Sequence, residues 1–342
     1  MPESASFLVP TAKGAVDIED LGMVLAHEHL FVWNPEYHAN FPSLWDRSAG
    51  TASAAAELEE AYEHGVRTIV DMTVLGQGRD PGLIAEVAER TRVNIVLATG
   101  VYVLDGLPQI VRYRGPGEVL DGPDPLIDMM ESDIRTGIAG TGIRAALVKF
   151  ASEKAEPDAT VLRLAAAVAE VHRRTRVPVV VHTDPVGGNA LPLLEILSTH
   201  GVDPRHVALA HAGDATDRGY LFELAQSGAF IGCDRFGMQA LAPDEQRVDT
   251  IAALIARGHL DQLLLSHDCA SFIDHVTPEQ RAAMSPGWSY SHLSTRVLPQ
   301  LRAAGLDDGA LATIFEDNPK RLLRGADLSV SVGAGRESVD VG

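Results

Sequence analysis

Eight short apolar runs alternate with longer amphipathic segments along this chain of 342 residues. Each run is apolar on both faces, which is typical of a strand buried in a parallel sheet. Repeated strand–helix alternation predicts parallel strands joined by helical crossovers, and eight such units favour closure into a barrel. The runs are Met23–His27, Thr68–Thr73, Ile95–Gly100, Ala145–Phe150, Val177–His182, Val207–His211, Ala229–Cys233 and Leu263–Ser266.

Four segments between these runs have the apolar spacing of amphipathic helices. They are Ala52–Glu63, Asp158–Arg174, Thr216–Gln226 and Val248–Arg257. An open doubly wound sheet is the rival fold, but no Gly-rich phosphate loop follows the first run. We therefore predict an α/β fold, a single (β/α)8 TIM barrel over residues 1–326, followed by a poorly ordered tail over residues 327–342.

The composition narrows the partners that such a barrel can have. Hydrophobic residues make up 46% and charged residues 22% of the chain, which is ordinary for a globular protein with a large core. The net charge of −19 repels phosphate backbones and anionic lipid. We therefore expect a small-molecule substrate, neutral or weakly charged, and neither nucleic acid nor a membrane as a partner. Cys233 and Cys269 are too few for a disulfide framework, and residues 1–10 lack a signal-peptide pattern, so we expect a cytoplasmic location.

Two irregular stretches follow strand ends and are expected to form the rim of the substrate site. Residues 105–125 hold four Gly and four Pro after the third run. Residues 271–288 follow the eighth run. Loops at the carboxyl ends of barrel strands line the mouth at which barrel enzymes act.

Polar side chains also stand at these strand ends. His27 and His29 end the first run, and both imidazoles can face the same way because side chains alternate along a strand. A lone histidine at such a place is more often structural than a ligand. Core packing does not explain six polar groups on one rim, because buried unpaired charges are costly. The six groups are His27, His29, Lys149, His182, His211 and Asp268.

The chemistry of these six residues predicts a binuclear metal centre at the C-terminal face of the barrel. Four imidazoles and one carboxylate are too many for one catalytic ion with an open position, and they suit two divalent ions about 4 Å apart. We expect zinc, and cobalt, manganese or iron would suit the same ligands. Lys149 would then be neutral and could add CO2 to become a carbamate that bridges both ions. The alternative is a salt bridge from Lys149 to Glu153 or Asp184.

In this order and on these strands, the six residues resemble the metal ligands of the amidohydrolase superfamily, and more closely those of the phosphotriesterase family. The nine residues from Gly22, GMVLAHEHL, are similar to the N-terminal pattern of that family. The resemblance runs from about Gly14 to Leu323. Tyr102 and Arg235 make the phosphotriesterase-like lactonases the best match within the family. Other matching segments are Thr99–Tyr102, His211–Asp214, Asp234–Gly237, Leu265–Asp268 and Asn318–Pro319.

The resemblance implies how the two ions are held. Lys149 would be carboxylated and would bridge them. His27, His29 and Asp268 would bind the more buried ion. The more exposed ion would be bound by His182 and His211.

It also implies a role in catalysis for Tyr102 and Arg235. Tyr102 would lie near the bridging hydroxide, although it could instead be a rim aromatic in contact with the core. Arg235 would fix the rim loops, although it could instead be an ion-pair partner of Asp234 or Asp268. We expect Asp268 to accept a proton from the attacking water and to pass it to the leaving group.

The activity implied by the resemblance is that of a lactonase, as a homodimer. The expected substrates are N-acyl homoserine lactones, which would make the protein a quorum-quenching enzyme, or aliphatic γ- and δ-lactones, with a promiscuous phosphotriesterase activity. A true organophosphate triesterase is the alternative, and a hydrolase of another carboxylic ester or amide is the third. A barrel that had lost catalysis should lack ligands, and all six are present. His275, near a position often held by Trp in lactonases, and the long 105–125 loop depart from the family pattern and leave the substrate open.

Overall fold

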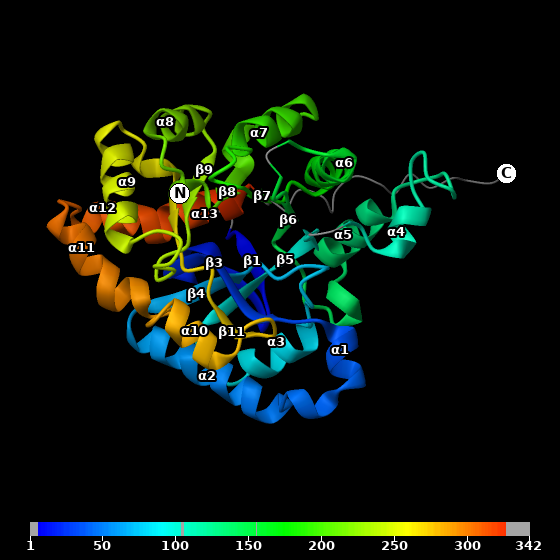
Figure 1. The fold of residues 1–342 in the computed structure, drawn as a ribbon, viewed down its shortest axis with the longest axis horizontal. Coiled ribbons are helices and arrows are strands. Elements are labelled where there is room, and N and C mark those ends of the chain that lie inside the picture. The colour runs from blue at the N-terminus through cyan, green and yellow to red at the C-terminus, as the bar shows by residue number, and fades with distance from the viewer. Residues whose placement is uncertain (1–5, 104–105, 155, 326–342) are drawn as a thin grey trace.

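The computed structural model describes residues 6–103, 106–154 and 156–325, and in these residues parallel strands form a barrel surrounded by helices (Figure 1). The predicted tail over residues 327–342 lies outside the described residues. No helix in the described part of the chain is long and apolar enough to cross a membrane.

All eight predicted strands are present, which confirms the (β/α)8 barrel. Neighbouring strands pair in parallel and in chain order from the first to the eighth. The register places Gly100 beside Lys149 and Ala151 beside His182, so the carboxyl ends of the strands meet at one mouth of the barrel. The strands are β3 (Met23–Val32), β4 (Val66–Asp71), β5 (Asn94–Val101), β6 (Leu147–Ala151), β7 (Val179–His182), β8 (Val207–Ala210), β9 (Phe230–Cys233) and β10 (Leu263–Leu265).

Helices connect these strands and cover the outside of the barrel (Figure 1). Several begin at an aspartate whose side chain accepts a backbone N–H of the first turn, as Asp158 does for α6 and Asp217 for α8. The helices are α1 (Pro35–Asn40), α2 (Arg47–Glu63), α3 (Pro81–Ala88), α4 (Gln109–Tyr113), α5 (Pro125–Arg135), α6 (Ala159–Thr175), α7 (Ala190–Thr199), α8 (Arg218–Gln226), α9 (Asp244–Ala256), α10 (Pro278–Met284), α11 (Leu298–Ala303), α12 (Asp308–Ala312) and α13 (Asn318–Arg324).

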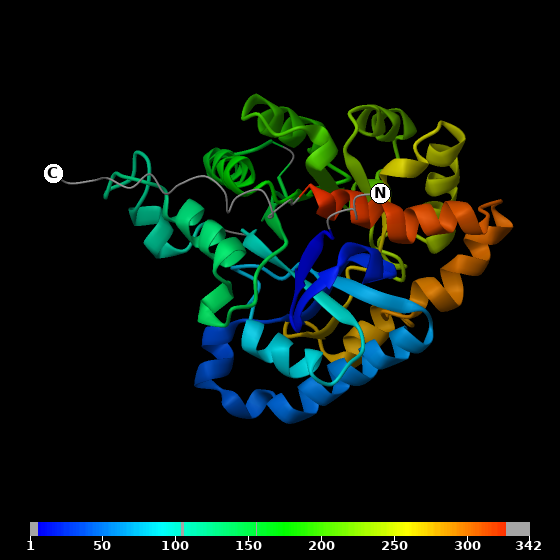
Figure 2. The same cartoon turned by 180° about the vertical axis from the view of Figure 1, so that it is seen from behind.

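An N-terminal hairpin covers the mouth of the barrel opposite the strand ends. Strands β1 (Leu8–Thr11) and β2 (Gly14–Asp17) pair in antiparallel fashion, and they lie across the barrel in the view from behind (Figure 2). Val9, Ile18 and Leu21 share one buried apolar cluster with barrel residues such as Val96 and Val180. The hairpin therefore closes this end with hydrophobic packing and leaves the other end for polar chemistry.

The seam between the first and last barrel strands differs from the other strand pairs. In the described residues no backbone ladder joins β10 to β3. The chain instead turns after β10 and forms β11 (Ala270–Ile273), which pairs with the outer half of β3. Among the hydrogen bonds that cross the seam, the N–H of His27 donates to the Ser266 hydroxyl (3.0 Å), the N–H of Asp268 donates to the His27 carbonyl (3.1 Å) and the N–H of His29 donates to the Cys269 carbonyl (2.7 Å).

The two stretches that we expected to be irregular are partly regular. The 105–125 loop contains α4, and residue 105 lies outside the described residues. The 271–288 stretch contains most of β11 and the whole of α10. A Thr-Pro start whose Thr277 side chain caps the helix in a capping box explains α10, and this pattern was present in the sequence.

Candidate metal centre

The first three candidate ligands come together at the seam. His27 and His29 lie on the same face of β3 and are 3% and 5% exposed. Asp268 lies in the turn between β10 and β11, and its Oδ1 is 3.2 Å from His29 Nε2 and 3.5 Å from His27 Nε2. One donor atom from each residue lies within 4.8 Å of the others, which is close enough to hold one metal ion.

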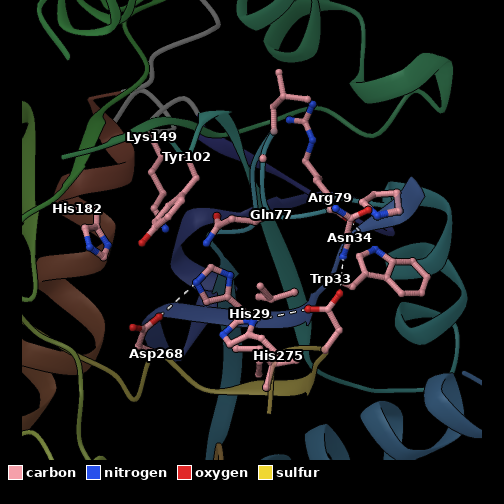
Figure 3. A pocket seen from close by; sticks show the side chains of 18 of the residues that line it. His29, Trp33, Asn34, Gln77, Arg79, Tyr102, Lys149, His182, Asp268 and His275 are labelled. Carbon is pink, nitrogen blue, oxygen red and sulfur yellow. Dashed lines mark hydrogen bonds and ion pairs between the residues drawn. The ribbon is translucent and has the colours of Figure 1, made fainter. Parts of the chain in front are cut away.

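The other three candidate ligands extend this cluster across the barrel. Lys149 Nζ is 3.4 Å from His27 Nε2, and His211 Nε2 is 2.9 Å from His182 Nδ1. His211 Nε2 also lies 3.9 Å from Asp268 Oδ2. All six side chains named from the sequence therefore converge at the carboxyl ends of β3, β6, β7, β8 and β10, and Figure 3 shows four of them at the cavity wall.

The protonation of these groups suits metal binding. Burial lowers the pKa of His27, His182 and His211, so these imidazoles are neutral near pH 7 and can offer a lone pair. Burial would raise the pKa of Asp268, but the imidazoles of His27, His211 and His29 hold it well below its ordinary value. Neutral nitrogen donors around a carboxylate fit zinc, cobalt, manganese and iron.

Lys149 lies in a buried site that disfavours its charged form. The side chain is 1% exposed, and burial lowers its pKa to about 8. Its Nζ contacts the Met72 carbonyl oxygen at 3.2 Å. Within the described part of the chain, Lys149 forms no ion pair with Glu153 or Asp184, and Glu153 instead accepts a hydrogen bond from the Tyr102 hydroxyl. The salt-bridge alternative therefore has no support in the structure.

Asp234 orients two of the imidazoles and was not assigned this role from the sequence. Its Oδ2 lies 3.0 Å from His27 Nδ1, and its Oδ1 lies 2.8 Å from His211 Nδ1. Burial would raise the pKa of Asp234, but the two imidazoles hold it well below its ordinary value. Because Asp234 binds both Nδ1 atoms, it directs the Nε2 atoms of His27 and His211 into the cluster. Although its oxygens also lie close enough to these histidines to share an ion, both face the Nδ1 side, so Asp234 supports the ligands from behind.

His29 is held in the same way by a hydroxyl group. Thr73 Oγ1 lies 2.8 Å from His29 Nδ1, which leaves Nε2 facing Asp268. Asp71 accepts the N–H of Thr73 at 2.8 Å and so fixes the threonine. These supporting residues lie on β4 and just beyond it, next to β3, and only the three-dimensional register reveals their partners.

Asp234→Asn is expected to weaken metal retention by about 10- to 100-fold, because the amide would place an N–H against one of the two imidazole Nδ1 atoms. The measurement is the metal content per chain during titration with a chelator. Asp217→Asn, which alters an exposed helix cap on α8, is the matched control and should behave like the wild type. Equal chelator sensitivity in the Asp234 variant and the wild type would contradict the orienting role.

Tyr102 and Arg235 flank the cluster on its exposed side. The Tyr102 ring meets the His182 ring edge-on, with centroids 5.2 Å apart. Burial, together with the Glu153 carboxylate, raises the pKa of Tyr102, so the phenol keeps its proton. Arg235 Nε is 3.7 Å from Asp268 Oδ2, while Asp234 is taken up by the two histidines. Of the two ion-pair partners considered for Arg235, the structure brings it to Asp268.

A cavity of about 1030 Å³ opens above the cluster. It is lined by Tyr102, Lys149, His182, Arg235 and Asp268, and also by Trp33, Asn34, Gln77, Asp274 and His275. Figure 3 shows Tyr102, Lys149, His182 and Asp268 on one side of the view and Trp33 and Asn34 on the other, with His29 between the two groups. Its size is in the range of small-molecule sites, and its lining is more apolar than polar, with Trp33, Met238 and Leu241 among the apolar residues.

The fold, with a cavity lined by candidate ligands at the carboxyl ends of its strands, defines a (β/α)8-barrel enzyme. The profile of the Phosphotriesterase family matches residues 8–323. The chain belongs to the phosphotriesterase family, and it is therefore a hydrolase.

Relatives in sequence and in structure agree with this assignment. A phosphotriesterase homology protein of Mycobacterium tuberculosis is 41% identical over 313 residues, which cover 91% of this chain and 96% of that protein. The solved structure of the phosphotriesterase from Mycobacterium tuberculosis superposes with a TM-score of 0.90 at 41% identity and covers 92% of this chain and 98% of its own. An aryldialkylphosphatase of Saccharolobus solfataricus is 33% identical over 311 residues, or 90% of this chain and 97% of that protein.

Proposed function

We propose that this hydrolase is a binuclear metal-dependent lactonase with a promiscuous phosphotriesterase activity. Its substrates would be N-acyl homoserine lactones or aliphatic γ- and δ-lactones. The observation that carries the proposal is the convergence of six candidate ligands beneath Tyr102 and Arg235 in one cavity. Lys149, as a carbamate, would complete a site for two divalent ions, with zinc as the expected metal and cobalt, manganese or iron as substitutes.

Each residue would have a defined part in the hydrolysis. Divalent ions held by these side chains would polarise the substrate oxygen and make a water molecule acidic enough to attack. Asp268 would accept the proton of that water and carry it to the leaving group. Tyr102 would orient the substrate oxygen from the exposed side of the site. Arg235 would keep the Asp268 carboxylate and the rim loop after β9 in place.

The proton donors of the site favour a lactone over an activated phosphotriester. Opening a lactone releases an alkoxide that remains tethered to the product and must be protonated before it closes the ring again. Asp268, after it has accepted the proton of the water, and the protonated Tyr102 phenol both line the cavity and would supply that proton. An aryl phosphotriester has a good leaving group and gains little from a proton donor.

Two other substrate classes remain as alternatives. The similarity to the aryldialkylphosphatase of Saccharolobus solfataricus supports a true organophosphate triesterase. A different carboxylic ester or amide would use the same candidate ligands with another fit in the outer cavity. The outer wall, with Asp274 and His275, is where such a difference in substrate would arise.

The proposal is tested by initial rates of the cobalt-loaded protein on a matched panel. The panel contains N-acyl homoserine lactones of several chain lengths, alkyl γ- and δ-lactones, paraoxon, simple esters and N-acyl amides. We expect the highest kcat/KM on a lactone and a lower, measurable rate on paraoxon. A higher kcat/KM on paraoxon, or on an amide, would replace the lactonase with that alternative, and inactivity on the whole panel would refute the hydrolytic proposal for these substrates.

We also propose that the protein is a cytoplasmic homodimer. Both cysteines, Cys233 and Cys269, are buried thiols, which suits a reducing compartment. Analytical ultracentrifugation of the purified chain measures the oligomeric state directly.

A further inference from the structure

One buried side chain that the proposed chemistry does not use makes several hydrogen bonds across the barrel seam. Glu28 lies between His27 and His29 on β3, so its side chain points to the opposite face of the strand, away from the cavity. It is 0% exposed. A carboxylate in such a position is costly unless hydrogen bonds replace the lost water.

The Glu28 carboxylate accepts four hydrogen bonds, all from the chain segment after β10. Oε1 accepts the Ser266 hydroxyl at 2.7 Å, the N–H of His267 at 3.0 Å and His267 Nδ1 at 2.7 Å. Oε2 accepts the N–H of Cys269 at 2.8 Å. The N–H of Leu293 donates to His267 Nε2 at 2.9 Å, so the proton of this imidazole is on Nδ1 and points to Glu28.

These bonds add to the two backbone hydrogen bonds at the seam, from the N–H of Asp268 to the His27 carbonyl and from the N–H of His29 to the Cys269 carbonyl. The N–H groups of His267 and Cys269 have no strand partner on β3 and end on the Glu28 side chain instead. The Ser266 hydroxyl, which donates to Glu28, also accepts the N–H of His27. One carboxylate thus connects the first barrel strand with the end of the last one.

The residue between the two bonded N–H groups is Asp268, and its backbone is strained. Its φ is +52°, in the left-handed region that residues with a Cβ atom seldom adopt. Its own N–H is held by the His27 carbonyl. Three consecutive N–H groups are therefore fixed from β3, and the resulting turn directs the Asp268 carboxylate to His29 Nε2. Without these bonds the turn would be expected to relax out of the left-handed region.

We propose that Glu28 is a positioning residue that helps to close the barrel seam and holds Asp268 in the left-handed conformation in which its carboxylate faces the other candidate ligands. The importance of this position for turnover rests on the role proposed for Asp268. The positioning of Asp268 by Glu28 depends only on the hydrogen bonds at the seam.

Glu28→Gln tests the inference because it keeps the size of the side chain but not its pattern of acceptors. A glutamine has one oxygen for the three donors at Oε1, and its NH2 group then meets the N–H of Cys269. We expect a folded protein in which kcat for the best lactone falls about 10- to 100-fold with little change in KM, and in which less metal is retained per chain. A crystal structure of the variant should show residue 268 moved out of the left-handed region.

Two further variants complete the experiment. Glu60→Gln removes an exposed carboxylate on α2 that accepts one serine hydroxyl, and it should leave kcat and metal content unchanged. Ser266→Ala removes the hydroxyl between His27 and Glu28, and if Glu28→Gln does not fold, a loss of kcat and of metal in this milder variant supports the inference.

The results separate a positioning role from a structural one. If Glu28→Gln lowers only the melting temperature, while kcat per folded chain, metal content and the φ of Asp268 stay as in the wild type, the inference is overturned. The same holds if neither Glu28→Gln nor Ser266→Ala changes metal content. Metal content and the conformation of residue 268 need no substrate, so they decide the matter even if the wild type hydrolyses no lactone and the proposed function fails.

Discussion

Asp268→Asn is expected to lower kcat by about 10²- to 10⁴-fold while most of the bound metal stays in place. Asparagine has the same shape and keeps one oxygen near His29 Nε2, so the contact at 3.2 Å can persist. It cannot accept the proton of the attacking water, and it cannot return a proton to the leaving group. Steady-state rates and metal analysis on the same preparation measure the two effects separately.

Asp268→Asn needs a control at an aspartate outside the cluster. Asp261→Asn changes an exposed aspartate just before β10, at the opposite end of that strand from Asp268, and should have the kcat of the wild type. If Asp268→Asn turned over substrate at a near-normal rate, Asp268 would not be the proton acceptor. If its metal were lost along with its activity, Asp268 would act chiefly as a ligand.

The fold could be predicted because strand burial leaves a strong pattern in the sequence. A strand buried on both faces is a continuous apolar run, and each of the eight runs overlaps a strand of the barrel. The extent of β3, which runs on to Val32, was underestimated, because its outer half is paired with β11 and not with β10. β11 has only four residues, which is too short for a clear apolar pattern in the sequence.

The convergence of the six candidate ligands could be predicted because strand ends are marked in the sequence, whereas the residues that support them could not. His27, Lys149, His182 and Asp268 each follow an apolar run, and parallel strands bring such positions to one mouth. Asp234 also follows a run, but its partners, His27 and His211, depend on which side chains share a face in space. The partners of Glu28, which stands between His27 and His29 in the sequence, likewise depend on the three-dimensional arrangement.

The charges near Lys149 in the sequence favour an exposed side chain, whereas the structure buries it. A lysine with Glu153 four residues further on in the chain suggests a surface ion pair, which is the usual state of a lysine. The strand instead buries Lys149 between the Met72 carbonyl and His27, and Glu153 turns to Tyr102. Burial without a carboxylate partner is what makes a neutral amine, and hence a carbamate, chemically accessible at this position.

Lys149→Ala is therefore expected to lower the metal content per chain and to reduce turnover by about 100-fold or more. The truncation removes the only group of the six candidate ligands that could be carboxylated, and it leaves space beside the Met72 carbonyl. A short carboxylic acid such as propionate fits the chemistry of the missing carbamate. It should restore part of the metal content and of the rate in the variant and have no such effect on the wild type.

Lys154→Ala is the matched control, because this lysine is 62% exposed and pairs with Asp158 on the surface. It should keep both metal content and rate, with or without propionate. If Lys149→Ala bound as much metal as the wild type and turned over substrate at the full rate, the carbamate would be ruled out. If it lost metal but did not respond to propionate, Lys149 would be needed as a packed side chain and not as a carboxylate, because only the carboxylate function can be supplied from solution.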